Sequence, residues 1–293
     1  MPERDDTRAA QDVLDEVNLA HGTRLRLLRR FDDGVQSGAW LLRGEDGRRA
    51  VLKWSPSRSW AGQILRAADA VAKIRSAGYP TPEWIAVGTG KGGFGYQVQA
   101  FVPGRSPDRV GAEEARLLIG LLETHTGLDP DPRRDWSRFV REQLSGHPDG
   151  LGQQAAATGA AGREMAAVCT RLLAAHGAVA LPTGDLVHGD FRPGNILLDA
   201  GRVSGVVDVE AIGSGTRAFD YATLLSAEGL TPEAVRMLCA AGERAAGPGV
   251  LAYCFAQVAL DLTVFVHRHR LERGIRNLRT LTDRAALLLS RAP

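Results

Sequence analysis

Two polar segments of the chain carry side chains whose types and spacing suit the transfer of a phosphoryl group. In the first, Asp190 is followed two residues later by a cation, Arg192, and three residues further by an amide, Asn195. The second adds two carboxylates, Asp208 and Glu210. Carboxylate and amide oxygens suit Mg²⁺, which bridges nucleotide phosphates, and an acidic side chain can receive or orient a hydroxyl proton. These segments therefore predict phosphoryl transfer to a hydroxyl group.

The complete pattern, H-x-D-x-x-x-x-N from His188 to Asn195 with a later Asp after a short hairpin, resembles the catalytic segment of the protein-kinase-like fold. The fuller text, HGDFRPGNIL and VVDVE, resembles the aminoglycoside phosphotransferase family and its small-molecule kinase relatives. The resemblance implies that Asp190 is the catalytic base or hydroxyl-orienting carboxylate. It implies that Asn195 and Asp208 hold Mg²⁺, with ATP or GTP as the phosphoryl donor. Arg192 then either neutralises the transferring phosphate or is a solvated surface arginine.

The same resemblance predicts a lysine on the third strand of a small lobe. Only three of the 36 basic residues are lysines, and one of them, Lys53, lies in the apolar run VLKW. A lysine kept on an apolar strand in so arginine-rich a chain favours a role at the nucleotide α- and β-phosphates. The preceding loop would cover the nucleotide with backbone N–H groups and a hydroxyl, through Gly34, Ser37 and Gly38.

Two further parts of the nucleotide site follow from the resemblance. The segment QAFVPG resembles the hinge at which such kinases read adenine, so Ala100 and Val102 are candidates through their main-chain groups. The helix after Lys53 should supply a carboxylate that orients the lysine, but residues 57–77 contain no glutamate. Either Asp69 replaces it, or Gln63 does so by a hydrogen bond, or the pair is absent.

The elements that must position these residues divide the chain into two lobes. Short strands around one helix, Trp60–Ala77, are expected over the first hundred residues, and Gly88–Gly95 is expected to join two of the strands as a hairpin turn. Helical periodicity dominates after Pro103-Gly104, and Gly127–Gly162 is expected to be a mobile or loosely helical insert. We therefore predict an α+β, protein-kinase-like bilobal fold: a β-rich nucleotide-binding lobe over 1–103, and a larger, mainly helical lobe over 104–293 with the catalytic loop and acceptor site.

Composition excludes several classes of protein. The 293 residues carry a formal net charge of +2, too balanced to indicate nucleic acid or an anionic membrane as the main partner. Three cysteines without C-x-x-C spacing indicate neither a disulfide framework nor the usual zinc site. The apolar run Val250–Val266 is shorter than the roughly 20 residues that cross a bilayer. We expect a cytoplasmic protein, monomeric or homodimeric, without a membrane or nucleic-acid partner.

The acceptor is expected to be a small hydroxylated molecule, with an aminoglycoside or another antibiotic as the leading candidate. A cationic antibiotic needs acidic residues in the acceptor site, and Glu210 and Asp261 are the candidates. The alternatives are a metabolic kinase of the choline, homoserine or thiamine type and a nucleotide-binding regulator with weak catalysis. A protein kinase is disfavoured because HGD replaces HRD and no A-P-E follows Asp208.

Overall fold

The computed structural model describes residues 2–31, 38–145 and 150–292, and it divides into two compact units. The first unit comprises Met1–Arg105 together with Leu197–Ala211, and the second comprises Ser106–Ile196 together with Ile212–Pro293. The segment 197–211 thus packs with the N-terminal part of the chain, whereas the sequence-based division placed it with the helical lobe. Asp208 and Glu210 consequently belong to the same unit as Lys53.

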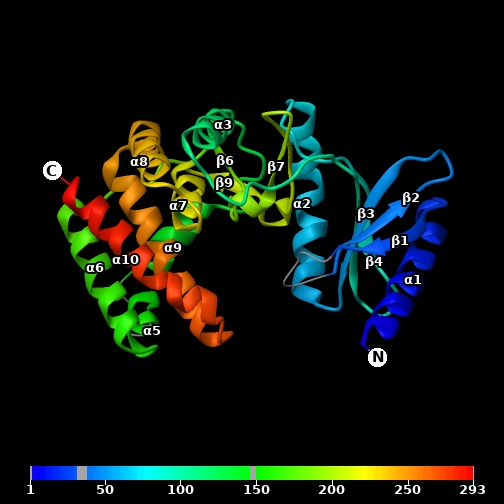
Figure 1. Cartoon of the computed structure of the whole chain (residues 1–293), viewed down its shortest axis with the longest axis horizontal. Helices are drawn as coiled ribbons and strands as arrows, with labels where there is room; N and C mark the ends of the chain where they lie inside the picture. The colour runs from blue at the N-terminus through cyan, green and yellow to red at the C-terminus, as the bar shows by residue number, and fades with distance from the viewer. Residues whose placement is uncertain (1, 32–37, 146–149, 293) are drawn as a thin grey trace. The chain divides into compact units, whose positions relative to one another are not determined.

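A five-stranded antiparallel sheet forms the centre of the first unit, with strand order β1-β2-β3-β5-β4 (Figure 1). All five strands lie within the first hundred residues, where short strands were expected. Their bounds are Arg26–Arg30 for β1, Trp40–Arg43 for β2, Arg49–Ser55 for β3, Trp84–Thr89 for β4 and Gly95–Ala100 for β5. The glycine-rich stretch between β4 and β5 is the expected hairpin turn, closed by Gly93 N–H donating to Gly90 O over 2.9 Å.

Two helices, α1 (Pro2–His21) and α2 (Arg58–Ser76), lie on either side of this sheet (Figure 1). Four apolar residues of α1 at helical spacing, Ala10, Val13, Leu14 and Val17, are buried against Leu42, Leu52 and Val98 of the sheet. Helix α1 was not among the expected elements, although this i, i+3, i+4, i+7 pattern is typical of an amphipathic helix. Since neighbouring residues of a strand point to opposite faces, Lys53 projects away from α1.

The short hairpin expected before Asp208 completes the first unit. Its strands are β7 (Ile196–Asp199) and β8 (Arg202–Val206), and the positive φ angles of Ala200 and Gly201, 48° and 74°, fit a tight two-residue turn. Arg105 pairs with Leu198, and Ser204 Oγ donates to Pro103 O over 2.6 Å. The hairpin is therefore attached to the segment that follows β5.

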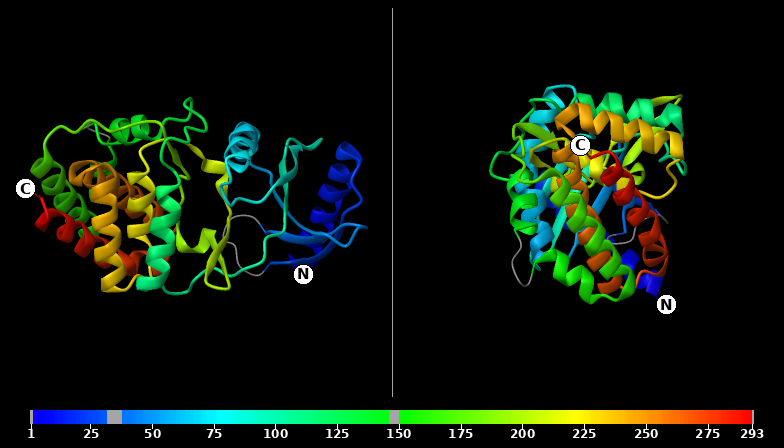
Figure 2. Two further views of the ribbon diagram at one scale, coloured as in Figure 1. Left: turned by 90° about the horizontal axis from the view of Figure 1, so that it is seen from above. Right: turned by 90° about the vertical axis from the view of Figure 1, so that its left-hand side faces the viewer.

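The second unit is mainly helical. Its helices are α3 (Ala112–Glu123), α4 (Trp136–Gln143), α5 (Leu151–Ala157), α6 (Ala160–His176), α7 (Ala218–Ser226), α8 (Pro232–Ala246), α9 (Pro248–Arg268) and α10 (Glu272–Ser290). The helices α6, α7, α8 and α10 pack around α9 (Figure 2). A two-stranded sheet pairs β6 (Asp185–Val187) with β9 (Gly213–Gly215). In the chain, β6 precedes the segment that contains Asp190, and β9 follows the segment that contains Asp208. The insert expected to be mobile or loosely helical contains α4 and α5.

Among the described residues, α9 is the one helix that is long and apolar enough to cross a membrane by length and composition. The core helix of a soluble protein passes the same test, and 61% of the apolar window of α9 is buried within the structure. Its buried residues include Phe255, Cys254 and Leu260, which face the other helices of the second unit. The packing of α9 is that of a core helix.

Candidate functional site

Lys53 is the centre of a charge cluster in the first unit. It lies on β3, is 8% exposed, and its Nζ donates a hydrogen bond to Asp208 Oδ1. Its second carboxylate partner is Glu210, whose Oε1 lies 3.7 Å from Nζ. Burial lowers the pKa of Lys53, but together Glu210 and Asp208 raise it by more, so the net shift of the pKa is upward. The amine is therefore held as a cation beside two acids.

Glu210 has a different environment from the one expected of an acceptor-site residue. It lies in the short 3-10 turn η2 (Val209–Ala211), and its side chain is only 16% exposed. Trp60 Nε1 donates to its Oε1 over 3.4 Å, and Arg66 Nη2 donates to its main-chain oxygen over 3.1 Å. Both donors come from α2. Within its unit, Glu210 thus contacts the lysine and the helix.

Neither of the expected partners from α2 reaches Lys53. Asp69 is exposed, and so is Gln63. The ion-pair partners of Lys53 among the described residues are Asp208 and Glu210. The expected Asp69–Lys53 pair is therefore not formed, because Asp69 lies on the solvent side of the helix while Ile64, Ala67 and Val71 form its buried side.

Asp208 follows the hairpin in a backbone conformation that few residues other than glycine adopt. Its φ is +61°, in the left-handed region. Such a conformation costs about 1–3 kcal/mol and persists only where the surroundings enforce it. In this conformation the Asp208 side chain reaches Lys53.

The loop after β6 places three of the predicted residues together in the second unit. The guanidinium of Arg192 spans the carboxylate of Asp190, with Nε 2.6 Å from Oδ1 and Nη2 2.7 Å from Oδ2. Asn195 Nδ2 donates to the main-chain oxygen of Asp190 over 2.8 Å and to its Oδ2 over 3.1 Å. These bonds fix the carboxylate while leaving it partly exposed. Asp190 is thus oriented by two neighbours and remains accessible.

Fully buried Asp220 of α7 holds the backbone of this loop. Its carboxylate accepts hydrogen bonds from His188 N–H over 2.8 Å and Gly189 N–H over 3.0 Å. His125, also fully buried, lies 3.2 Å from the same carboxylate through Nδ1. The backbone of the loop is therefore held by Asp220, which in turn contacts His125. No sequence signal singled out His125.

Close packing against an aromatic ring explains the glycine in this loop. Gly189 has φ +84°, and a Cβ there would lie 2.3 Å from Cζ2 of Trp136. Trp136 in turn packs on Phe219 of α7, with ring centroids 4.6 Å apart. Only glycine combines this φ with this approach.

The predicted nucleotide-binding residues are partly described. Gly34 and Ser37 lie outside the described residues, and Gly38 lies next to Arg30. The N–H of Ala100 donates to Glu83 O over 2.8 Å, so only its carbonyl is a candidate for contact with a base. Val102 is half-buried, and the described part of the chain offers its N–H no hydrogen-bond acceptor. Val102 therefore fits the predicted main-chain role better than Ala100.

Asp261, the other predicted acceptor residue, lies on α9 in the second unit and is exposed. The surrounding protein raises its pKa, and Arg268 opposes that shift.

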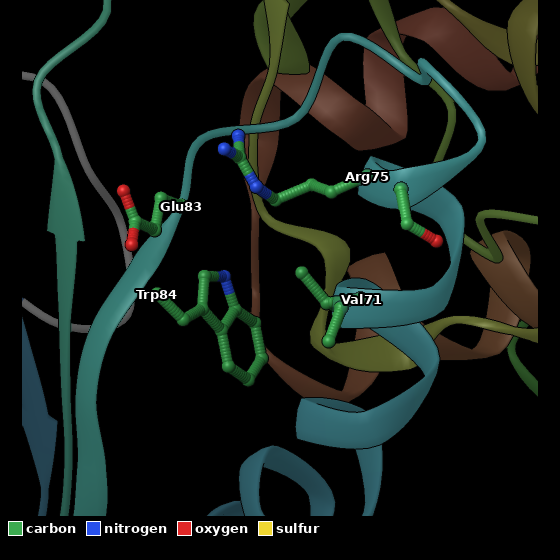
Figure 3. Close-up of a pocket in the computed structure, with 6 residues that line it drawn as sticks. Val71, Arg75, Glu83 and Trp84 are labelled. Carbon is green, nitrogen blue, oxygen red and sulfur yellow. The ribbon is translucent and has the colours of Figure 1, made fainter.

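A cavity of about 410 Å³ in the first unit is lined by α2 and the start of β4, including Val71, Arg75 and Trp84 (Figure 3). The predicted site residues are absent from its lining.

The two residues predicted to hold a divalent cation, Asn195 and Asp208, both carry oxygen donors. Because Asn195 Nδ2 is used by Asp190, its Oδ1 faces the other way as an acceptor. Asp208, in the first unit, carries a carboxylate with oxygen donors. Among the described residues there is no group of three or more His, Cys, Asp or Glu that could hold a metal. This chemistry fits Mg²⁺, which keeps waters and phosphate oxygens as ligands, better than a metal with an all-protein shell.

A family model matches most of the chain. The model of the phosphotransferase enzyme family, APH, matches residues 28–254, which contain every predicted site residue except Asp261. No curated protein sequence matches the chain.

Solved structures give the fold. An aminoglycoside-3'-phosphotransferase of type VIII has 22% identity and a TM-score of 0.58, with coverage of 83% of this chain and 97% of that one. A thermostable mutant of aminoglycoside phosphotransferase APH(4)-Ia, in ternary complex with ADP and hygromycin B, has 15% identity, coverage of 93% and 96%, and a TM-score of 0.61. The macrolide 2'-phosphotransferase MphH from Brachybacterium faecium has 17% identity, coverage of 92% and 97%, and a TM-score of 0.58. The predicted protein-kinase-like α+β fold is confirmed.

Proposed function

Because the chain belongs to the phosphotransferase enzyme family, we propose that it transfers the γ-phosphoryl group of ATP or GTP to a hydroxyl of a small-molecule antibiotic. It is a small-molecule kinase by family, and the antibiotic is the proposed part. The observation that carries the proposal is Asp190, a partly exposed carboxylate fixed by Arg192 and Asn195 on a loop that Asp220 braces.

The nucleotide half of the proposal rests on the first unit. Lys53 is a buried cation with flexible reach, suited to the α- and β-phosphates. Asp208, together with Asn195 of the second unit, would hold Mg²⁺, which would supply positive charge to neutralise the charge that develops during transfer. Val102 offers its main-chain N–H to adenine. The ADP in the APH(4)-Ia complex supports a nucleotide as cofactor.

The catalytic half rests on the second unit. The Asp190 carboxylate is placed to accept or orient the proton of the acceptor hydroxyl. Arg192 neutralises that carboxylate when no substrate is bound, and its positive charge is available to a transferring phosphate. Positioning and charge stabilisation account for most of the catalysis of phosphoryl transfer, so this small set of residues is sufficient.

The choice of antibiotic over metabolite rests on the related structures. The solved structures of similar fold include aminoglycoside and macrolide phosphotransferases. Asp261 is the remaining candidate to contact a cationic group of the acceptor, since Glu210 is engaged with Lys53. A metabolic kinase of the choline, homoserine or thiamine type is the alternative proposal.

A panel of hydroxylated compounds tests the proposal. Aminoglycosides, macrolides, choline, homoserine and thiamine would be incubated with the protein, Mg²⁺ and γ-labelled ATP or GTP, and product phosphorylation measured by mass spectrometry. We expect phosphorylation of at least one antibiotic. Turnover of a metabolite alone would favour the alternative, and turnover of no antibiotic would refute the proposal.

Asp190→Ala is the matching control. We expect turnover to fall by at least about 10²-fold, because a positioned general base contributes about 10²–10⁴-fold. Nucleotide binding, measured by calorimetry, should persist, since Lys53 and Asp208 lie in the other unit. Unchanged turnover in Asp190→Ala would remove Asp190 from the proposed chemistry.

The site of action is proposed to be the cytoplasm, where ATP and GTP are available. The packing of α9 among the helices of its own unit supports this placement. Fractionation of cells producing the protein should recover it with cytoplasmic markers, and recovery with membranes would contradict the proposal.

A further inference from the structure

The helix beside Lys53 supplies donors where a carboxylate was expected. Its one acidic residue, Asp69, faces solvent, and residues 57–77 contain no glutamate. Lys53 is nevertheless buried, and a buried ammonium group needs a carboxylate partner to remain charged. When a nucleotide and Mg²⁺ occupy the site, a nearby carboxylate must still pair with Lys53.

Asp208 is not sufficient as the ion-pair partner of Lys53 when the nucleotide and Mg²⁺ are bound. It is also the proposed ligand of the metal, and a carboxylate oxygen that coordinates a cation is less available to an ammonium group. Glu210 is free of that demand. Its Oε1 lies 3.7 Å from Lys53 Nζ, and its Oε2 is buried with no hydrogen-bond partner in the described structure. Glu210, the second carboxylate beside Lys53, therefore carries a buried oxygen that accepts no hydrogen bond in the described structure.

Two residues of α2 hold Glu210 in that position. The indole N–H of Trp60 donates to the carboxylate, and the guanidinium of Arg66 donates to the main-chain oxygen. Both contacts lie within the first unit. Glu210 is therefore attached to α2 through both its side chain and its main chain.

We propose that Glu210 positions Lys53 for the nucleotide phosphates, and that Trp60 and Arg66 link this pair to α2. The inference rests on the proposed role of Lys53 in nucleotide binding. It makes Glu210 a positioning residue instead of an acceptor-binding one. The carboxylate then comes from Glu210, two residues after Asp208, and α2 supplies hydrogen-bond donors to Glu210 instead of supplying the carboxylate itself.

A double-mutant cycle tests this role without knowledge of the acceptor. The affinity for the non-hydrolysable nucleotide AMP-PNP with Mg²⁺ is measured by calorimetry for wild type, Lys53→Met, Glu210→Gln and the double variant. We expect Glu210→Gln to weaken binding about ten- to a hundred-fold, the range for loss of a charged hydrogen-bond partner. In the Lys53→Met background the same change should have no further effect, because the residue acts through the lysine.

Each outcome of the cycle has a distinct meaning. A wild type that fails to bind the nucleotide overturns the proposed function and this inference with it. If wild type binds, Lys53→Met weakens binding and Glu210→Gln does not, the proposed function stands and this inference fails. A loss in Glu210→Gln that persists in full without the lysine also overturns it, since Glu210 then acts independently, for example on the metal. Asp69→Asn should leave the affinity unchanged, and a loss there would return the role to α2.

Paired tryptophan variants test the link to the helix. Trp60→Phe keeps an aromatic ring and removes the N–H that Glu210 accepts, so we expect a severalfold loss of nucleotide affinity. Trp84→Phe is the matched control, because Trp84 Nε1 is buried with no hydrogen-bond partner in the described structure. Unfolding midpoints confirm that both variants fold. Equal affinities in the two variants would refute the role of Trp60.

Discussion

At the scale of single residues, the candidate site depends on side chains held by neighbours in irregular backbone. Asp190 lies in a loop, and Asp208 follows a hairpin with a left-handed φ. Such conformations are stable only because buried groups enforce them. For the Asp190 loop the enforcing contacts are the Asp220 carboxylate beneath and the Trp136 ring beside Gly189.

Gly189→Ala should therefore damage the site more than its size suggests. The new methyl group would meet the indole of Trp136 at a positive φ, so we expect the free energy of unfolding to fall by about 1–3 kcal/mol. Gly194→Ala in the same loop is the control, because nothing lies within 4 Å of a Cβ there. Urea denaturation of both variants measures the difference, and equal stabilities would contradict the steric explanation.

At the scale of elements, α1 is the clearest difference between sequence and structure. It precedes the residues that the family model matches, yet it covers one face of the sheet. Leu14 is fully buried there, whereas Leu19 of the same helix is 81% exposed. The helix is thus part of the core of the first unit.

Paired leucine variants quantify the contribution of α1. Leu14→Ala should lower the free energy of unfolding by about 2–5 kcal/mol, through lost apolar burial and the cavity left behind. Leu19→Ala should change it by less than about 0.5 kcal/mol, because the side chain is already in water. A small effect of Leu14→Ala in chemical denaturation would show that α1 detaches without cost to the sheet.

At the scale of the whole molecule, the buried thiols make stability depend on pH. Cys169, Cys239 and Cys254 are all buried in the helices of the second unit. Burial raises the pKa of Cys169 to about 12 and that of Cys239 to about 11, and it raises the pKa of Cys254 as well. Unfolding exposes all three thiols, which then titrate near pH 8.5, about the ordinary value.

The sign of the effect follows from proton binding. Between about pH 8.5 and 11 the unfolded chain releases thiol protons that the folded protein retains, so the free energy of unfolding falls as pH rises. The expected slope is at most about 1.4 kcal/mol per pH unit for each thiol. Urea titrations at pH 8, 9 and 10 measure it, and a flat profile would contradict the burial. Native protein should also resist alkylation at pH 8, while the urea-unfolded control reacts at three thiols.

Sequence alone determined the polar segments, the strand lysine and most elements, because each is encoded locally by residue spacing. The pattern around Asp190 and Asn195 identified the phosphotransferase family, and hydrophobic periodicity located the strands and the longer helices other than α1. Only the tertiary structure decided which carboxylate accompanies Lys53. Asp69 was a candidate as the one carboxylate in residues 57–77, but it lies on the exposed side of α2, and Glu210, beside Lys53, comes from more than 150 residues away. Such a pairing depends on how distant segments pack, and local residue pattern carries no information about it.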